Sequence, residues 1–88
     1  PWIYSPQLVI VLFFEQLINQ MSELTVFFGL KVREQRKLKK ISQEKLALLC
    51  NIDRSYMGRI ERGEVNITLE KIYEIAKALE IDPKKLLP

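Results

Sequence analysis

The 88-residue sequence contains no histidine and a single cysteine, Cys50. It therefore lacks a disulfide framework, a Cys/His cluster of the kind that binds zinc, and a cysteine-histidine nucleophile pair. The carboxylates are dispersed along the chain, and no glycine-rich phosphate loop is present. We therefore do not expect an enzyme, and we expect neither a metal, nor another cofactor, nor a small-molecule ligand.

Lysine and arginine are absent from residues 1–30, which carry only Glu15 and Glu23 as charged groups. Residues 31–88 hold 14 basic and 9 acidic side chains, a net charge of +5, whereas the whole chain has a net charge of +3. Excess positive charge on a small domain favours a polyanionic partner, although many ordinary proteins reach this value. Charge alone is therefore a weak indication of nucleic-acid binding.

Seven consecutive apolar residues, from Leu8 to Phe14, distinguish residues 1–20 from the rest of the chain. The run is shorter than the roughly 18 to 20 apolar residues that cross a bilayer, and no cationic leader precedes it, so we expect no membrane partner and a cytoplasmic location. This atypical segment has several interpretations. It is an extra N-terminal helix packed on the domain, a dimer contact, or non-native or upstream-translated sequence ahead of a start at Met21. Residues 21–88 are predicted to form one domain.

Helical periodicity, without any strand pattern, predicts an all-α fold for residues 21–88. Five helices are expected, at about 25–39, 43–50, 54–62, 69–80 and 83–87. Their starts are indicated by residues that cap helix N-termini, namely Ser42, Asp53, Thr68 and Asp82. Asn51 and Gly63 occupy positions where helices end in a left-handed residue.

Apolar residues at helical spacing indicate the inward faces of these helices. The predicted inward residues are Phe28 and Val32 in the first helix, Leu46, Ala47 and Cys50 in the second, Met57 and Ile60 in the third, and Leu69, Ile72, Ala76 and Leu79, widened by Tyr73 and Ile75, in the fourth.

Two short helices joined by a tight turn form the supersecondary unit that presents a helix to the major groove of DNA. The two helices at about 43–50 and 54–62 meet its requirements. Ala47 is small enough for a close crossing, Asn51 tolerates the turn, and Met57 and Ile60 face inward. A helix-turn-helix is therefore predicted from Ser42 to Gly63.

Residues 41–81, ISQEKLALLCNIDRSYMGRIERGEVNITLEKIYEIAKALEI, resemble the helix-turn-helix of the Xre, Cro and lambda-repressor-like family. The resemblance extends over residues 28–87. Within the family, the sequence is most similar to controller proteins of restriction-modification systems, although prophage repressors share much of the pattern. It implies a five-helix lambda-repressor-like domain that acts as a sequence-specific regulator of transcription on double-stranded DNA. It also implies a homodimer on a palindromic operator, with Ile81, Leu86 and Leu87 as candidate contacts.

The resemblance also implies the roles of individual residues. Helix 54–62 would enter the major groove. Base edges would be read by Arg54, Ser55 and Arg59, phosphates would be contacted by Gln43, Tyr56, Arg62 and Asn66, and Arg36 with Glu61 would form a structural ion pair. Arginine is suited to base readout because it donates two hydrogen bonds to guanine O6 and N7.

Three positions depart from the family pattern. Asn51 replaces the usual turn glycine, Ile67 stands where proline is common, and Gln35 stands where many relatives have an apolar residue. Three alternatives stay open from the sequence alone: a prophage-type repressor, an antitoxin-like regulator, or a protein-interaction module that uses the same helices.

Overall fold

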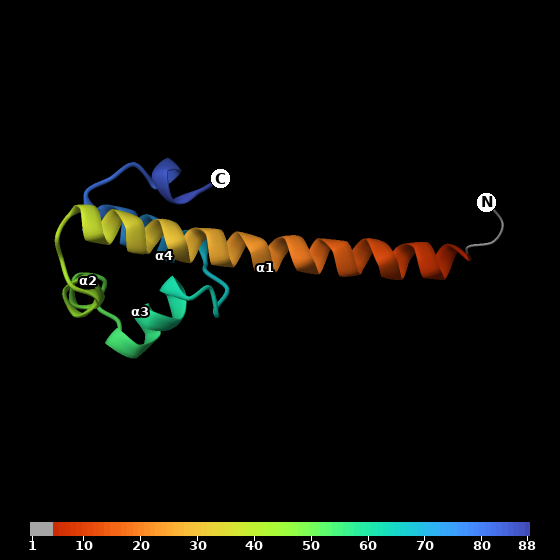
Figure 1. Cartoon of the computed structure of the whole chain (residues 1–88), viewed down its shortest axis with the longest axis horizontal. Helices are drawn as coiled ribbons and strands as arrows, with labels where there is room; N and C mark the ends of the chain where they lie inside the picture. The colour runs from red at the N-terminus through yellow and green to blue at the C-terminus, as the bar shows by residue number, and fades with distance from the viewer. Residues whose placement is uncertain (1–4) are drawn as a thin grey trace.

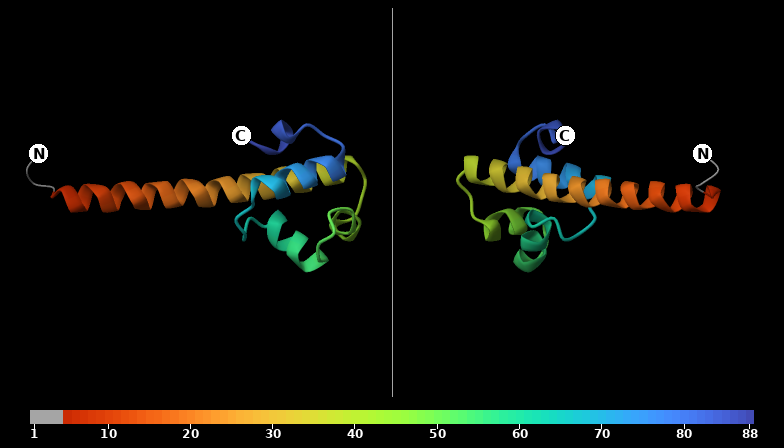
Figure 2. Two further views of the ribbon diagram at one scale, coloured as in Figure 1. Left: turned by 180° about the vertical axis from the view of Figure 1, so that it is seen from behind. Right: turned by 45° about the vertical axis from the view of Figure 1, so that its right-hand side comes forward.

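The computed structural model describes residues 5–88, without the side chains of residues 18 and 20–22, and within this part of the chain it contains helices and no strand. The elements are α1 (Pro6–Leu38), α2 (Gln43–Leu49), α3 (Arg54–Glu61), α4 (Leu69–Leu79) and a single turn of 3-10 helix, η1 (Pro83–Leu86). The C-terminal half of α1 runs beside α4, α2 and α3 lie on one side of this pair, and η1 lies on the other (Figures 1 and 2). The expected all-α, five-helix fold is confirmed.

The first helix is much longer than expected, because α1 spans 33 residues from Pro6 and does not begin near Thr25. Ser5 caps it, since its Oγ accepts a hydrogen bond of 3.2 Å from the Leu8 amide, and Pro6 stands at the first helical position, where its missing N–H is not needed. No proline or glycine interrupts the chain between Pro6 and Gly29. The change of composition near residue 21 is therefore not a helix boundary. The expected extra N-terminal helix is the first part of α1, residues 6–24, which we call the N-terminal extension.

This N-terminal extension projects away from the other helices and gives the molecule its length of 57 Å against widths of 24 and 20 Å (Figure 1). Its described side chains are exposed from Leu8 to Leu17. Of the alternatives given for residues 1–20, a helix packed on the domain is therefore wrong. None of the helices in the described part of the chain is long and apolar enough to cross a membrane.

Capping side chains start the later helices close to the predicted positions. Ser42 Oγ accepts from the Lys45 amide at 2.9 Å, and Thr68 Oγ1 accepts from the Lys71 amide at 3.2 Å. Asp53 occupies the cap position of α3 in extended backbone, but its side chain makes no capping hydrogen bond. The other predicted helix ends lie within about two residues of the observed ones, a normal uncertainty at frayed termini.

Each of the four α-helices is followed, within two residues of its last residue, by one with left-handed backbone. These residues are Lys40, Asn51, Gly63 and Glu80, with φ of 58°, 57°, 73° and 57°. After α2, the Asn51 amide donates to the Leu48 carbonyl at 3.1 Å and the Ile52 amide donates to the Ala47 carbonyl at 3.0 Å, the paired hydrogen bonds of a Schellman motif. The left-handed positions of Asn51 and Gly63 are confirmed, and those of Lys40 and Glu80 were not predicted.

The core forms where all five helices meet. Its buried apolar residues are Phe28, Val32, Leu46, Ala47, Cys50, Met57, Ile60, Ile75, Ala76, Leu79 and Leu86. Leu69 and Tyr73 were predicted to belong to it and do not, because 74% and 61% of their surfaces are exposed. Leu86 is fully buried in this core and is therefore not free to contact another copy. Burial also raises the pKa of the Cys50 thiol, which keeps it protonated and unreactive.

Candidate nucleic-acid interface

Helix α3 has a buried face and a polar face. Met57, Gly58, Ile60 and Glu61 are buried, whereas Arg54, Ser55 and Arg59 are exposed. Arg62, the C-terminal capping residue of α3, is also exposed and extends the row formed by Ser55 and Arg59 at spacings of four and three residues. Within Arg54–Glu61 the exposed charges are therefore all positive, because the only acid of the helix faces inward.

That inward acid, Glu61, is held by side chains from two other helices. Arg36 of α1 donates from Nε to Glu61 Oε2 at 2.8 Å and from Nη2 to Oε1 at 3.1 Å. Gln43, the first residue of α2, donates from Nε2 to Glu61 Oε1 at 3.2 Å, and Arg36 Nη1 donates to the Ile41 carbonyl at 3.1 Å. Charge-assisted, two-pronged arginine-carboxylate contacts are geometrically specific, so this network fixes the position of α3 relative to α1 and α2.

Close contact with α1 fixes the C-terminal end of α3. A Cβ atom on Gly29 would lie 2.4 Å from the Ile60 carbonyl oxygen, and one on Gly63 would lie 2.6 Å from Val26 Cα. Thr25 Oγ1 also donates to the Gly63 carbonyl at 3.1 Å. The two glycines therefore allow the backbones of α1 and α3 to approach more closely than side-chained residues would permit.

Gly58 has a comparable role at the junction of α2 and α3. A Cβ atom there would lie 3.0 Å from Arg62 Nη1 and 3.4 Å from Gln43 Oε1. The Arg62 guanidinium therefore lies back over α3, next to Gln43 at the start of α2. The sequence analysis did not single out Gly58, although a glycine inside a helical pattern often signals a close approach.

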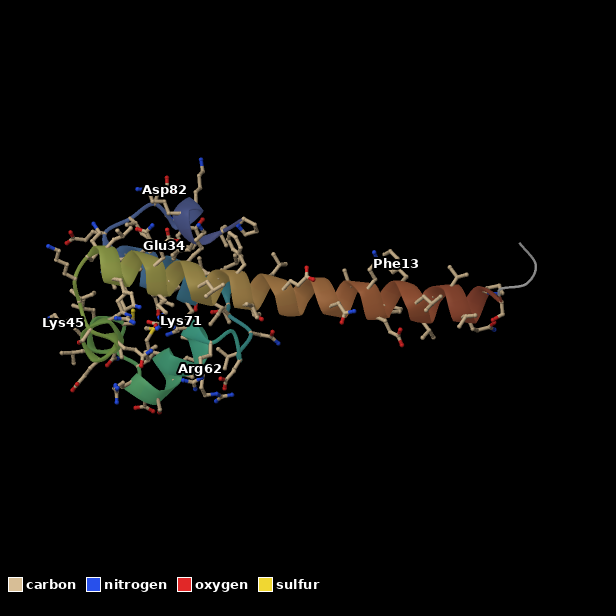
Figure 3. The ribbon with its side chains drawn as sticks, viewed as in Figure 1. Phe13, Glu34, Lys45, Arg62, Lys71 and Asp82 are labelled. Atoms are coloured by element: carbon tan, nitrogen blue, oxygen red, sulfur yellow. The ribbon has the colours of Figure 1, made fainter. Side chains whose placement is uncertain are left out.

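Arg62 already has an acidic neighbour. Its Nε donates a hydrogen bond to Glu64 Oε2, and both side chains are largely exposed. Figure 3 shows the place of Arg62 at the end of α3. This hydrogen bond lowers the pKa of the Glu64 carboxyl. A phosphate that binds Arg62 must therefore compete with a carboxylate.

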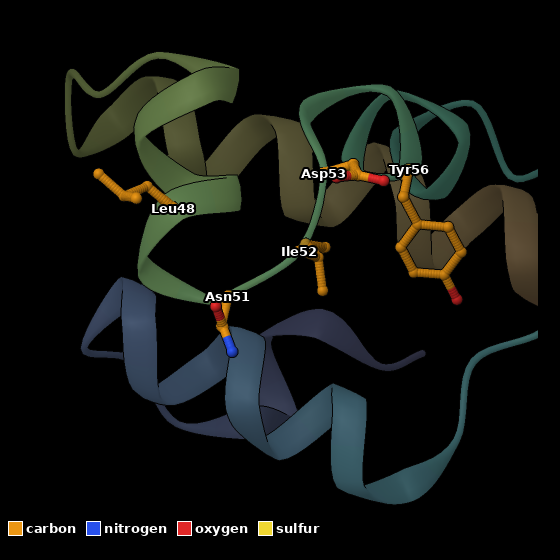
Figure 4. Close-up of a pocket in the computed structure, with 5 residues that line it drawn as sticks. All are labelled: Leu48, Asn51, Ile52, Asp53 and Tyr56. Atoms are coloured by element: carbon orange, nitrogen blue, oxygen red, sulfur yellow. The ribbon is translucent and has the colours of Figure 1, made fainter.

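Two of the predicted contact residues lie apart from this row. Tyr56 is half-buried against the core, and its ring extends from α3 toward α4, at one side of a solvent-open hollow of about 450 Å³ in the turn (Figure 4). Asn66 is exposed in the loop between α3 and α4. The structure thus brings Arg54, Ser55, Arg59 and Arg62 to the surface of α3 with Gln43 beside Arg62, and it places Tyr56 and Asn66 at its margins.

Among the residues that the structure describes, no group of histidine, cysteine, aspartate and glutamate side chains is placed to hold a metal ion. The arrangement of α3 is that of a helix held rigidly from behind while its outer face offers hydrogen-bond donors and positive charge. Such a face can contact the base edges and phosphates of a DNA groove.

Comparison with known proteins agrees with this geometry. Residues 32–86 match the helix-turn-helix family. The chain is similar to the control protein C.BamHI of Bacillus amyloliquefaciens, with 46% identity over 67 residues that cover 75% of this chain and 83% of the relative. It is also similar to the control protein C.SmaI of Serratia marcescens, with 43% identity over 56 residues that cover 64% of this chain and 67% of the relative. Among solved structures, the restriction-modification controller protein C.AhdI of Aeromonas hydrophila superposes with a TM-score of 0.69 and 48% identity, over 72% of this chain and 91% of that protein.

Proposed function

Because this chain belongs to the helix-turn-helix family of DNA-binding transcriptional regulators, we propose that it controls the transcription of a restriction-modification operon. In this proposal the protein acts as a homodimer on a palindromic operator. Each copy inserts α3 into one of two major grooves that lie about one helical turn apart. The proposal keeps the expected cytoplasmic location.

The observation that carries the proposal is the separation of charge on α3. Glu61 is only 6% exposed and is paired with Arg36, whereas Arg54 and Arg59 are exposed on the outer side of the helix. Donors and positive charge on the outer side suit a groove-facing helix, since the groove presents acceptors such as guanine O6 and N7 and is flanked by phosphates. The buried acid keeps negative charge away from that face.

The roles of the individual residues follow from their places on the helix. Arg54, Ser55 and Arg59 are proposed to contact base edges, with the two arginines, five residues apart, reaching different base pairs. Arg62 and Gln43 are proposed to contact phosphate at the junction of α2 and α3. Tyr56 and Asn66, at the margins of the face, are proposed as further phosphate contacts, which fix register without reading sequence.

The descriptions of the relatives support the proposal that the target is a restriction-modification operon. C.BamHI and C.SmaI are described as control proteins, and C.AhdI is described as a restriction-modification controller protein. A prophage-type repressor or an antitoxin-like regulator would use the same helix in the same way, so the neighbouring genes distinguish these alternatives. A restriction endonuclease and a methyltransferase beside the gene are expected.

A fluorescence anisotropy titration tests the DNA-binding proposal. The protein should bind the duplex upstream of its own gene more tightly than a shuffled duplex, and affinity should fall steeply with salt. Arg59→Ala should weaken specific binding by about 10- to 100-fold, the range expected for a lost two-pronged base contact. Arg33→Ala, which removes an arginine of α1 that is also exposed, is the matched control and should leave affinity within about threefold.

Two results would contradict the proposal. Equal affinity for the upstream and shuffled duplexes would remove sequence specificity. Equal effects of Arg59→Ala and Arg33→Ala would show that α3 does not read the operator. Regulation that persists in cells when Arg54 and Arg59 are both alanine would favour the alternative of a protein-interaction module.

A further inference from the structure

The N-terminal extension of α1 carries an apolar stripe that no part of the described chain covers. Within residues 5–24 this stripe consists of five large side chains that are 40% to 63% exposed: Ile10, Phe13, Phe14, Leu17 and Leu24. We call this set the N-terminal stripe. Further down the same helix face, Phe28 and Val32 are buried in the core. The face that packs against the domain therefore continues beyond the domain without a partner.

The spacing of the stripe is that of a helix that pairs with another helix. Ile10, Leu17 and Leu24 recur at intervals of seven residues, and Phe14, Met21 and Phe28 repeat at the same interval in the sequence, offset by four. Apolar residues at these two positions of a heptad form the contact seam of a coiled coil. Phe28, the last residue of this repeat, is buried in the core of its own domain.

We propose that the N-terminal stripe is a contact surface for a second copy of this chain, in which two α1 extensions pair side by side. The stripe contains no charged residue. Glu15 and Glu23 fall on the opposite side of the helix by its 3.6-residue periodicity, so pairing would bury neither acid. A second copy offers the same uncharged, heptad-spaced surface, which makes the stripe complementary to itself.

Charge on the rest of the molecule favours an antiparallel pair. Residues 31–88 carry 14 basic and 9 acidic side chains, so parallel extensions would bring two positively charged domains together. Antiparallel extensions place those domains at opposite ends. Leu17 would then lie opposite Leu17 of the second copy, and Ile10 would lie opposite Leu24.

The area of the stripe suits an interface between two copies. If each of its side chains exposes about 100 Å², two copies would cover about 1,000 Å² in total, which is near the lower limit for a specific protein interface. Val11 borders the stripe beside Phe14, is 51% exposed, and would extend the contact.

A lipid surface suits the extension less well than a second copy. No helix of the described chain is long and apolar enough to span a bilayer. A helix that lies on a membrane carries lysine and arginine on its polar face to meet anionic headgroups, whereas residues 1–30 contain neither. The polar residues of the extension are glutamine, asparagine, serine and glutamate.

Sedimentation of the full-length chain over a concentration series tests the pairing. Leu17→Glu should weaken self-association by at least about tenfold, because it places a charge at the centre of the seam. Gln16→Glu adds the same charge at the neighbouring position, off the stripe, and should leave the dissociation constant within about threefold. Helical circular dichroism should be the same for both variants, which separates loss of pairing from loss of fold.

Cysteine cross-linking tests the orientation. A mixture of Ile10→Cys and Leu24→Cys chains should form a disulfide between the two variants, while Ile10→Cys alone should not cross-link to itself. Cross-linking of Ile10→Cys to itself would overturn the antiparallel arrangement. Equal association of Leu17→Glu and Gln16→Glu would overturn the pairing itself.

Binding to vesicles tests the alternative that the N-terminal stripe contacts a lipid surface. Leu17-dependent binding to phosphatidylcholine vesicles by a chain that does not self-associate would assign the stripe to a lipid surface instead. These outcomes are independent of DNA binding. Leu17→Glu leaves α3 intact, and Arg59→Ala leaves the stripe intact, so the two proposals fail separately.

Discussion

At the scale of single residues, the described interior of this protein holds one carboxylate, and its position determines what α3 presents to solvent. Glu61 lies under α3 with 6% of its surface exposed, within hydrogen-bonding distance of Arg36 and Gln43. A buried charge is tolerated only when it is paired and hydrogen-bonded. The ion pair therefore positions the helix, while the exposed arginines contribute its positive charge.

Glu61→Gln should destabilise the fold by about 3 kcal/mol, because the substitution leaves the Arg36 guanidinium, whose side chain is 12% exposed, without its counter-charge. Urea unfolding followed by circular dichroism measures the change. The control is Glu74→Gln, which removes the acid of the exposed pair with Lys71 and should cost less than about 0.5 kcal/mol. Similar losses in the two variants would show that the buried network contributes no more than a surface pair.

Glu64→Gln should strengthen binding to operator DNA by about two- to tenfold and steepen its salt dependence. The substitution removes the carboxylate that competes with phosphate for Arg62, and an exposed ion pair costs little to break. Anisotropy titrations at several salt concentrations measure both effects. Glu34→Gln removes the acid of a comparable exposed pair with Lys31, on the side of α1 away from α3, and should change affinity little (Figure 3). Unchanged affinity of the Glu64→Gln variant would show that Arg62 does not contact the DNA.

At the scale of helices, local chemistry predicted α2, α3 and α4 well because their ends are marked by side chains. Ser42 and Thr68 make the expected capping hydrogen bonds, and Asn51 adopts the expected left-handed turn. The start of α1 was missed because its composition changes near residue 21 while its helical conformation does not. The amino-acid composition of a helix reflects its surroundings, whereas capping residues mark where the helix begins.

Contacts between helices were less accessible to sequence reasoning. The pairing of Arg36 with Glu61 followed from the family resemblance and not from spacing, since 25 residues separate them. The role of Gly58 depends on which side chains lie above it, and the sequence shows only that a glycine interrupts a helix. Leu69 and Tyr73 fit the apolar spacing of α4 but lie where no other helix covers them.

Two of the left-handed residues that follow helices are of types that disfavour this conformation. Lys40 and Glu80 have φ of 58° and 57°, a conformation that costs roughly 1–2 kcal/mol for most residues. Glycine adopts it freely but loses more conformational entropy on folding. Lys40→Gly and Glu80→Gly should therefore each stabilise the fold by about 0.5 kcal/mol or more, measured as a higher Tm.

Lys39→Gly is the matched control for these substitutions. Lys39 precedes Lys40 but has right-handed backbone, with φ of −80°. Glycine gains nothing there, so the variant should lose about 0.5–1 kcal/mol and melt at a lower temperature. If Lys39→Gly and Lys40→Gly shift Tm in the same direction, the left-handed turn after α1 does not strain the lysine backbone.

At the scale of the whole molecule, two parts with different chemistry share one helix. Every core residue lies between Phe28 and Leu86, and the family match covers residues 32–86. Among its described residues, the N-terminal extension contributes exposed apolar surface and no core residue. We therefore interpret residues 21–88 as the DNA-binding domain, and the extension as a separate contact surface on the same helix.

Deleting residues 1–20 should leave the domain folded, because the described side chains from Leu8 to Leu17 are exposed and pack against no other helix. In thermal melts at low protein concentration, the shortened chain should unfold in one cooperative transition, with a Tm within a few degrees of the full chain. At higher concentration the Tm of the full chain should rise further than that of the shortened chain, because pairing of the extensions stabilises only folded chains that carry them. A shortened chain without a cooperative transition would show that the core depends on the extension. A parallel rise of both Tm values would show that the extension contributes nothing to association.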